Sequence, residues 1–184
     1  MSLSAKLSRS ARKVPASFPK LLSKISPLLA EVDLSNVWVS QSAASDFAKN
    51  CPNLQVFRWN GSHSNVFVCG QDLQRCQKLL EIHMEDSCFY ASDKEFVKFV
   101  LGPLHPQYFP FWRVKDKLEK VNIKNATYRI HSQNANDIKS VPQEAIMKFV
   151  RGAPKLCWLK SDLLPENIAL LRIERPDIRF VTDE

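Results

Sequence analysis

One spacing of apolar residues returns along this chain and organises the rest of it. A leucine is followed three positions later by a second apolar residue and five positions later by a third. The clearest copies are Leu54, Phe57 and Trp59; Leu79, Ile82 and Met84; and Leu118, Val121 and Ile123. Weaker copies stand at Leu29, Val32 and Leu34, and at Leu156, Leu159 and Ser161. A fixed spacing that returns after helical segments indicates stacked supersecondary units with one continuous core.

The distances between these copies predict an irregular solenoid. They are 25 residues from Leu29 to Leu54, 25 to Leu79, 39 to Leu118, 38 to Leu156 and 22 to Ile178, so the two long intervals must hold insertions. We predict a curved α/β solenoid of about five or six repeats, with short parallel strands on one side and helices on the convex side, because strand-helix-strand crossovers are right-handed. The strand residues expected to be almost fully buried are Leu54, Phe57, Leu79, Ile82, Leu118, Val121, Leu156 and Leu159.

Apolar residues at helical spacing predict the segments between the strands. Helices are expected at residues 18–25, 43–50, 71–78 and 143–150, and from Pro165 onward. The last of these should bury Ile168 and Leu171, with Leu170 as a weaker candidate. Ser92 with Glu95 forms a capping box for a further helix, and Ser140 with Gln143 starts the helix over 143–150. Residues 131–139 read as an exposed polar loop, and residues 176–181 as a short terminal strand.

The cysteines indicate packing rather than chemistry. There are five, and an odd number without a secretory signal peptide favours reduced thiols. Cys51 and Cys76 each stand three residues before a strand leucine, where Ala153 stands in a later copy, which is typical of small buried filler. No pair of cysteines has the two-residue spacing of a zinc site, so we expect neither a metal nor a cofactor.

The net charge of +7 is concentrated at the beginning of the chain. Residues 1–30 hold six basic and no acidic residues, which leaves 20 basic against 19 acidic residues for 31–184. A nearly neutral body disfavours nucleic-acid binding by the repeats, and the absence of a run of 18 apolar residues argues against membrane insertion. We expect a disordered basic tail over 1–17 and a repeat domain over 18–184; a mitochondrial transit peptide and a fragment of a longer repeat protein are the alternatives.

The strand residues between the apolar positions predict a binding face, because side chains alternate along a strand. On the concave side we expect Arg58, His83 and Trp158 at the centre of a protein interface, since aromatic residues and arginine dominate interface energies. Charge sign changes from strand to strand there, which suits a structured polypeptide better than a uniform polyanion. The surrounding contacts are expected to be Glu81, Glu85, Lys120, Asn122, Lys124 and Lys160.

A proline- and aromatic-rich stretch over 103–112 predicts a competing site. Its rings either cover the convex helices as extra core or anchor a partner from a protruding loop, because stiff aromatic side chains give large contact area at little entropic cost. The residues concerned are Tyr108, Phe109, Phe111 and Trp112.

Catalysis has little support in the sequence. The histidines are scattered, no Gly-rich phosphate loop occurs, and the densest polar cluster is Glu81, His83 and Glu85. On a strand these three share one face, which fits an exposed polar face better than a general base. We predict a non-enzyme; a small hydrolase using His83 would need a nucleophile that the sequence does not reveal.

Three stretches carry a resemblance to a known family. Cys51-Pro-Asn-Leu-Gln-Val-Phe, Cys76-Gln-Lys-Leu-Leu-Glu-Ile and Arg175-Pro-Asp-Ile-Arg-Phe-Val resemble leucine-rich repeats. They are most similar to the irregular, cysteine-containing repeats found behind F-box motifs in cullin-type ubiquitin ligase receptors. The likeness covers residues 18–181 and implies a monomeric substrate-recognition part of such a receptor, in the cytoplasm or nucleus. A mitochondrial assembly or scaffold factor built on the same repeats is the alternative.

The chain departs from that family in two ways. It contains no F-box, so adaptor binding either was lost or lies outside this chain. The asparagine or cysteine that normally follows the last strand residue by three is replaced in each copy, so the usual side-chain ladder under the loops is expected to be missing. The residues at that position are Val37, Ser62, Ser87 and Ala126.

Overall fold

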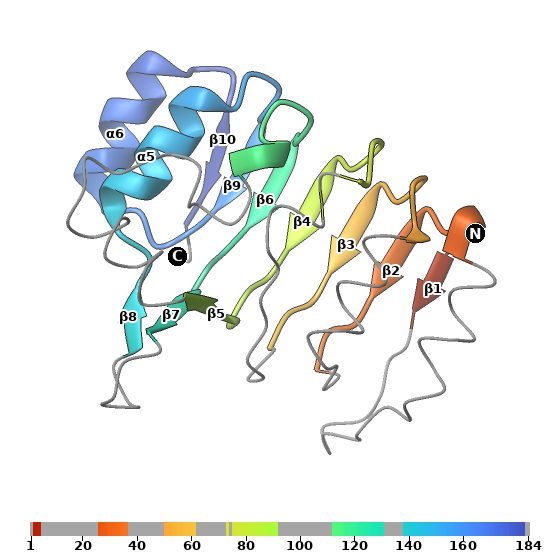
Figure 1. The fold of residues 1–184 in the computed structure, drawn as a ribbon. Helices are drawn as coiled ribbons and strands as arrows, with labels where there is room; N and C mark the ends of the chain where they lie inside the picture. Colours follow the sequence, from red (N-terminus) through yellow and green to blue (C-terminus); the bar gives the residue numbers. More distant parts are fainter. Residues whose placement is uncertain are drawn as a thin grey trace.

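Short parallel strands, laid side by side in chain order, form the body of the molecule (Figure 1). The computed structural model describes residues 2–4, 26–36, 50–61, 73, 75–91, 112–130 and 138–182. Its larger sheet has seven strands in the order β1-β2-β3-β4-β6-β9-β10. Every neighbouring pair in it is parallel, so the fold is an α/β solenoid of the leucine-rich-repeat type, as predicted. The strands are β1 (Ser2–Ser4), β2 (Glu31–Asp33), β3 (Val56–Arg58), β4 (Glu81–His83), β6 (Lys120–Asn122), β9 (Trp158–Lys160) and β10 (Arg179–Val181).

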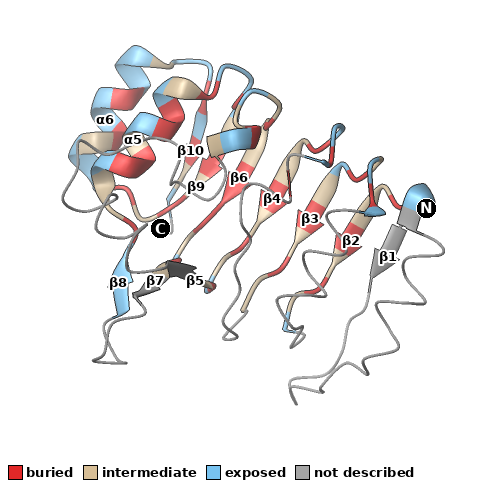
Figure 2. Ribbon diagram, in the orientation of Figure 1, coloured by how far each residue is buried: buried red, intermediate tan, exposed pale blue. Residues whose placement is uncertain are grey.

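One register runs through the sheet and places the apolar positions in rows. From β2 to β10 the middle residue of each strand is buried, and Figure 2 shows these residues as a band across the strands. All the strand residues predicted to be buried are at most 3% exposed, which confirms the repeat interpretation. The aligned middle residues are Val32, Phe57, Ile82, Val121, Leu159 and Phe180.

The same turn leads into most of the strands. The N–H of the residue that opens the apolar trio donates to the carbonyl three residues earlier, at 3.1 to 3.2 Å. This bond joins Leu54 to Cys51, Leu79 to Cys76, Leu156 to Ala153 and Ile178 to Arg175.

The residue that accepts this bond is small and buried until the last repeat. Cys51, Cys76 and Ala153 are fully buried, which confirms their prediction as filler. Arg175 replaces them in the final copy, and its guanidinium donates to the carbonyls of Val150, Ala153 and Leu156 at 2.8, 3.1 and 3.2 Å. One side chain therefore satisfies three backbone acceptors at the end of the stack.

Each of the strands β2, β3, β4 and β6 is followed by a sharp corner. The residue two positions after the apolar trio has a positive φ: 60° at Asn36, 66° at Gly61, 54° at Asp86 and 56° at Asn125. Glycine adopts this conformation without steric cost, and asparagine and aspartate tolerate it better than other residues. The chain thus uses the suitable residue types at one equivalent position in four repeats.

Side chains do support these corners, so the expectation of a missing ladder is wrong in part. Ser87 is buried, and its hydroxyl donates to the carbonyl of Trp59 at 2.8 Å. Asn60 Oδ1 accepts from the N–H of Glu85 at 2.9 Å, and the N–H of Asn60 donates to Ser35 Oγ at 3.1 Å. Serine and asparagine at neighbouring positions therefore replace part of the regular ladder.

Two helices, α5 (Gln143–Gly152) and α6 (Pro165–Glu174), lie side by side next to β9 and β10 (Figure 1). Both were predicted. Ile168 and Leu171 are buried as expected, but Leu170 is 43% exposed, because it lies on the side of α6 away from the core. Ser140 was wrongly predicted to start α5: the N-cap is Pro142, and no side chain caps the helix.

A second, smaller sheet was not predicted. It joins β5 (Cys88–Ala91), β7 (Thr127–Ile130) and β8 (Ile138–Ser140), with β5 and β7 parallel and β7 and β8 antiparallel. The prediction of an exposed polar loop over 131–139 is therefore wrong at residues 138 and 139, which belong to β8. All three residues of that strand are nevertheless exposed.

Several predicted features lie outside the described residues. These are the helices over 18–25 and 43–49, the capping box at Ser92 and Glu95, and three of the four loop aromatics. Of the helix predicted over 71–78, Leu73 is helical and buried, whereas residues 75–78 are not helical. Short 3-10 helices occur at η1 (Ser26–Leu28) and η3 (Trp112–Val114). In the predicted tail, β1 is a strand that the sequence analysis did not anticipate.

Candidate functional site

The face of the sheet opposite the buried row carries three rows of mainly polar residues. We call this surface the open face. Two rows are the outer residues of each strand from β2 to β10, and the third row lies two positions after the second. The residues that follow the third row continue the backbone pairing: the N–H groups of Asn36, Gly61 and Asp86 donate to the third-row carbonyls of the next repeat. The rows are Glu31, Val56, Glu81, Lys120, Trp158 and Arg179; Asp33, Arg58, His83, Asn122, Lys160 and Val181; and Ser35, Asn60, Glu85, Lys124 and Asp162.

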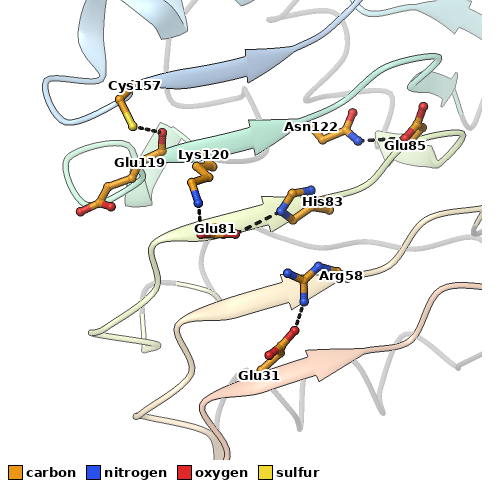
Figure 3. A network of polar contacts seen from close by, with 9 residues as sticks. All are labelled: Glu31, Arg58, Glu81, His83, Glu85, Glu119, Lys120, Asn122 and Cys157. Carbon is orange, nitrogen blue, oxygen red and sulfur yellow. Dashed lines mark hydrogen bonds and ion pairs between the residues drawn. The ribbon is translucent and has the colours of Figure 1, made fainter. Parts of the chain in front are cut away.

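Two glutamates of the repeat that contains β4 link this face across three strands. Glu81 accepts from Lys120 Nζ at 2.7 Å and lies 3.4 Å from His83 Nε2. Glu85 accepts from Asn122 Nδ2 at 2.9 Å and from Lys160 Nζ at 2.8 Å. Figure 3 shows Glu81 between His83 and Lys120, with Glu85 beside Asn122. The rows are therefore bonded to one another between strands.

Two further ion pairs lie on either side of this centre. Arg58 on β3 pairs with Glu31 on β2 (Figure 3), and Lys124 Nζ lies 3.0 Å from Asp162. The side chains of these four residues are between 23% and 36% exposed. Water therefore reaches the charges, and a ligand could reach them as well.

Two rings stand at the middle of the open face. The centroids of His83 and Trp158 are 6.0 Å apart, with the ring planes tilted by 47°, although β6 separates their strands. Both residues are half-buried. The rings extend across β6 and give the polar face a local aromatic surface.

The titration of this centre follows from its packing. Burial lowers the pKa of His83 below its ordinary 6.5, and this outweighs the hydrogen bond with Glu81. Burial alone would raise the pKa of Glu81, but the hydrogen bonds from Lys120 and His83 bring it below its ordinary value. At neutral pH the centre therefore holds a neutral imidazole beside an ionised carboxylate.

The residues predicted for the concave face all lie on the open face. Glu81, His83 and Lys120 are in contact, and so are Glu85, Asn122 and Lys160. Arg58 lies beside His83 in the register of β3 and β4, and Trp158 contacts His83 from two strands away. The expected central trio is thus brought together.

The competing loop site is described only at Trp112. Its ring packs against the core, Lys115 Nζ lies 5.2 Å from the ring centroid, and a methyl group in place of the Gly152 hydrogen would come within 2.9 Å of the ring. Trp112 therefore behaves as a covering residue for α5. Tyr108, Phe109 and Phe111 lie outside the described residues.

Sequence reasoning missed Arg179, which extends the first row onto β10. The cause is a shorter last repeat: Leu156 and Leu159 are three positions apart, whereas Ile178 and the equivalent Phe180 are two apart. A constant spacing would have placed Phe180, not Arg179, on the open face. The signal that could have revealed it is Phe180 itself. A large apolar residue that is buried at position 180 places its two neighbours, Arg179 and Val181, on the open face.

Among the described residues, no three histidine, cysteine, aspartate or glutamate side chains are grouped so as to hold a metal ion. In the same part of the chain no helix has the length and apolar character needed to cross a membrane.

Comparisons with known proteins add little. No family model and no curated protein sequence matches the chain. A solved structure titled Leiomodin-1 Actin-Binding Site 2 is similar with a TM-score of 0.46 and 11% sequence identity, covering 89% of this chain and 96% of that one. At this level the likeness carries no information about what the present chain binds.

Proposed function

We propose that this chain is a protein-interaction module and that the open face binds a polypeptide. The observation that carries the proposal is the arrangement at the centre of that face, where two rings are surrounded by paired charges of both signs. A partly exposed aromatic surface within a polar frame is the composition of many interface centres.

The charge balance supports a polypeptide over a nucleic acid. Binding to a phosphate backbone requires an excess of lysine and arginine, because affinity comes from neutralised phosphates. Among the described residues, the open face instead has as many carboxylates as cations. The acidic residues are Glu31, Asp33, Glu81, Glu85 and Asp162, and the basic ones are Arg58, Lys120, Lys124, Lys160 and Arg179.

The cysteine-containing repeats support a more specific version of this proposal. In it, the chain is the substrate-recognition part of a ubiquitin ligase receptor, and the open face holds the substrate. The adaptor site would then be contributed by another segment or another protein. Co-precipitation of a cullin adaptor with the tagged chain tests this version, and its absence under conditions that retain other partners would refute it.

The location of the protein is proposed to be cytoplasmic or nuclear. The basic, acid-free residues 1–30 support a mitochondrial scaffold as the alternative. Fusing these residues to a fluorescent protein separates the two, because import into mitochondria would overturn the first location and a diffuse signal would remove the second.

The binding face is tested by comparing three variants in a quantitative pull-down. Trp158→Ala should weaken capture of the partners at least about tenfold, as expected for a central aromatic anchor. Trp112→Ala tests the competing loop. Ile173→Ala is the control, because it removes an apolar side chain that is 81% exposed on α6, away from both candidate sites. Circular dichroism must show that all three remain folded. Loss of capture in Trp112→Ala alone would move the site to the loop, and unchanged capture by Trp158→Ala would refute the open face.

A further inference from the structure

The charges of the open face are segregated between its two halves. On β2, β3, β4 and their third-row positions, four carboxylates stand against one guanidinium, a net charge of −3 with His83 neutral. On β6, β9 and β10, with the third-row positions that follow β6 and β9, the described residues hold four cations and one carboxylate, a net charge of +3. Among the described residues from β2 to β10, the open face is therefore neutral in total but bipolar.

Three of the four ion pairs of the open face follow the same direction. In the pairs Glu31–Arg58, Glu81–Lys120 and Glu85–Lys160 the acid belongs to the repeat nearer β2 and the base to the repeat nearer β10. The Lys124–Asp162 pair has the opposite order. Partly exposed ion pairs contribute little to stability, so these groups can exchange their internal partners for those of a ligand.

The dimensions of the face set the length of such a ligand. Neighbouring strands lie about 4.8 Å apart, so the five steps from β2 to β10 span about 24 Å. An extended peptide advances about 3.3 Å per residue and would cross this distance with about seven or eight residues. Its middle would lie over the rings of His83 and Trp158, which favour apolar side chains.

We propose that the partner contributes a bipolar segment of about eight residues, and this rests on the function proposed above. One end of the segment is basic and lies over β2 to β4, its centre is apolar, and its other end is acidic and lies over β6 to β10. Charge complementarity commits the face to this class of polypeptide rather than to a uniformly charged one.

Synthetic peptides test the arrangement of charge separately from the binding face. A fluorescent peptide of three lysines, two leucines and three glutamates is compared with a peptide of the same composition in which the charges alternate. In fluorescence anisotropy at low salt the segregated peptide should bind at least about fivefold more tightly. The difference should shrink in about 0.5 M salt, where screening is strong.

Charge-reversal variants make the test specific. Lys120→Glu with Lys160→Glu changes the net charge of the basic half from +3 to −1. A peptide in which the three glutamates are replaced by lysines should then bind this variant better than the segregated peptide does. Lys148→Glu with Lys155→Glu is the matched control, because it changes the total charge equally at exposed positions outside the open face. The control should keep the preference of the wild type.

The outcomes separate the two proposals. Equal affinities for the segregated and alternating peptides, with both lost in Trp158→Ala, would refute the bipolar ligand and leave the open face standing. No binding of any peptide at millimolar concentration would refute the peptide class, while the pull-down still decides on the face. Formation of a dimer at low salt that the charge reversal abolishes would overturn the proposal in favour of a second copy of this chain, whose halves would complement each other.

Discussion

Gly61 offers a sharp test of the repeated corner. Its φ of 66° lies in the left-handed region, and a methyl group added there would stand 2.7 Å from Asn36 Oδ1 at the corner of the preceding repeat. Gly61→Ala therefore introduces two separate costs. One is backbone strain at a single residue, and the other is a contact between neighbouring repeats.

The strain should be the larger cost. A non-glycine residue in the left-handed region costs roughly 1–2 kcal/mol, and about 0.4–1 kcal/mol is offset because alanine restricts the unfolded chain. The Asn36 oxygen is at the end of a flexible side chain and can rotate away, so the contact should add only a few tenths of a kcal/mol. We expect Gly61→Ala to lower the free energy of unfolding by about 1 kcal/mol, or roughly fivefold in the folding equilibrium constant.

A double-mutant cycle measured by urea unfolding separates the two costs. In the Asn36→Gly background the contact is absent, so most of the loss caused by Gly61→Ala should remain. Gly61→Asn is the matched control, because asparagine is larger than alanine but tolerates this conformation, as Asn36 and Asn125 do. Asparagine should therefore cost less than alanine. If it costs more, or if Asn36→Gly abolishes the loss, crowding and not backbone strain governs the corner.

Three other predictions concern single side chains. Ser87→Ala should lower stability by about 1–2 kcal/mol in urea unfolding, because it removes the donor to the Trp59 carbonyl in a buried place; a change below a few tenths would contradict this role. Burial lowers the pKa of His83, so the unfolded chain binds the proton first as pH falls below about 6.5, and stability should decline from there through the folded pKa. His83→Gln should flatten the stability profile between pH 6.5 and 5, whereas an unchanged slope would assign it to other groups. Burial raises the pKa of Cys51 to about 12, so iodoacetamide at pH 8 should modify exposed Cys157 about a hundredfold faster or more, as mapped by mass spectrometry, and comparable rates would contradict the packing.

The strands and their core could be predicted because one physical requirement repeats. Every unit must bury the same positions against its neighbours, and Phe57 and Ile82 stand in identical places for that reason. The corners left a signal that could have been used, since Asn36, Gly61 and Asp86 are 25 residues apart and belong to the residue types that accept a positive φ.

Other features depend on partners that periodicity does not reveal. Ser140 has the sequence signature of an N-cap, but pairing with β7 places it in a strand instead. Leu170 and Leu171 are both apolar, and only the position of α6 against the sheet decides which is buried. The open face was located by alternation, whereas its division into two charged halves required the order of strands in the sheet.

The equal intervals of the first repeats have a consequence for how such a chain can change. From β2 to β4, a residue and the one 25 positions later occupy equivalent places in the sheet. Duplication or loss of a block of 25 residues would therefore preserve the register on both sides of the junction. The number of repeats, and with it the length of the open face, can then change by whole units while the core positions stay the same.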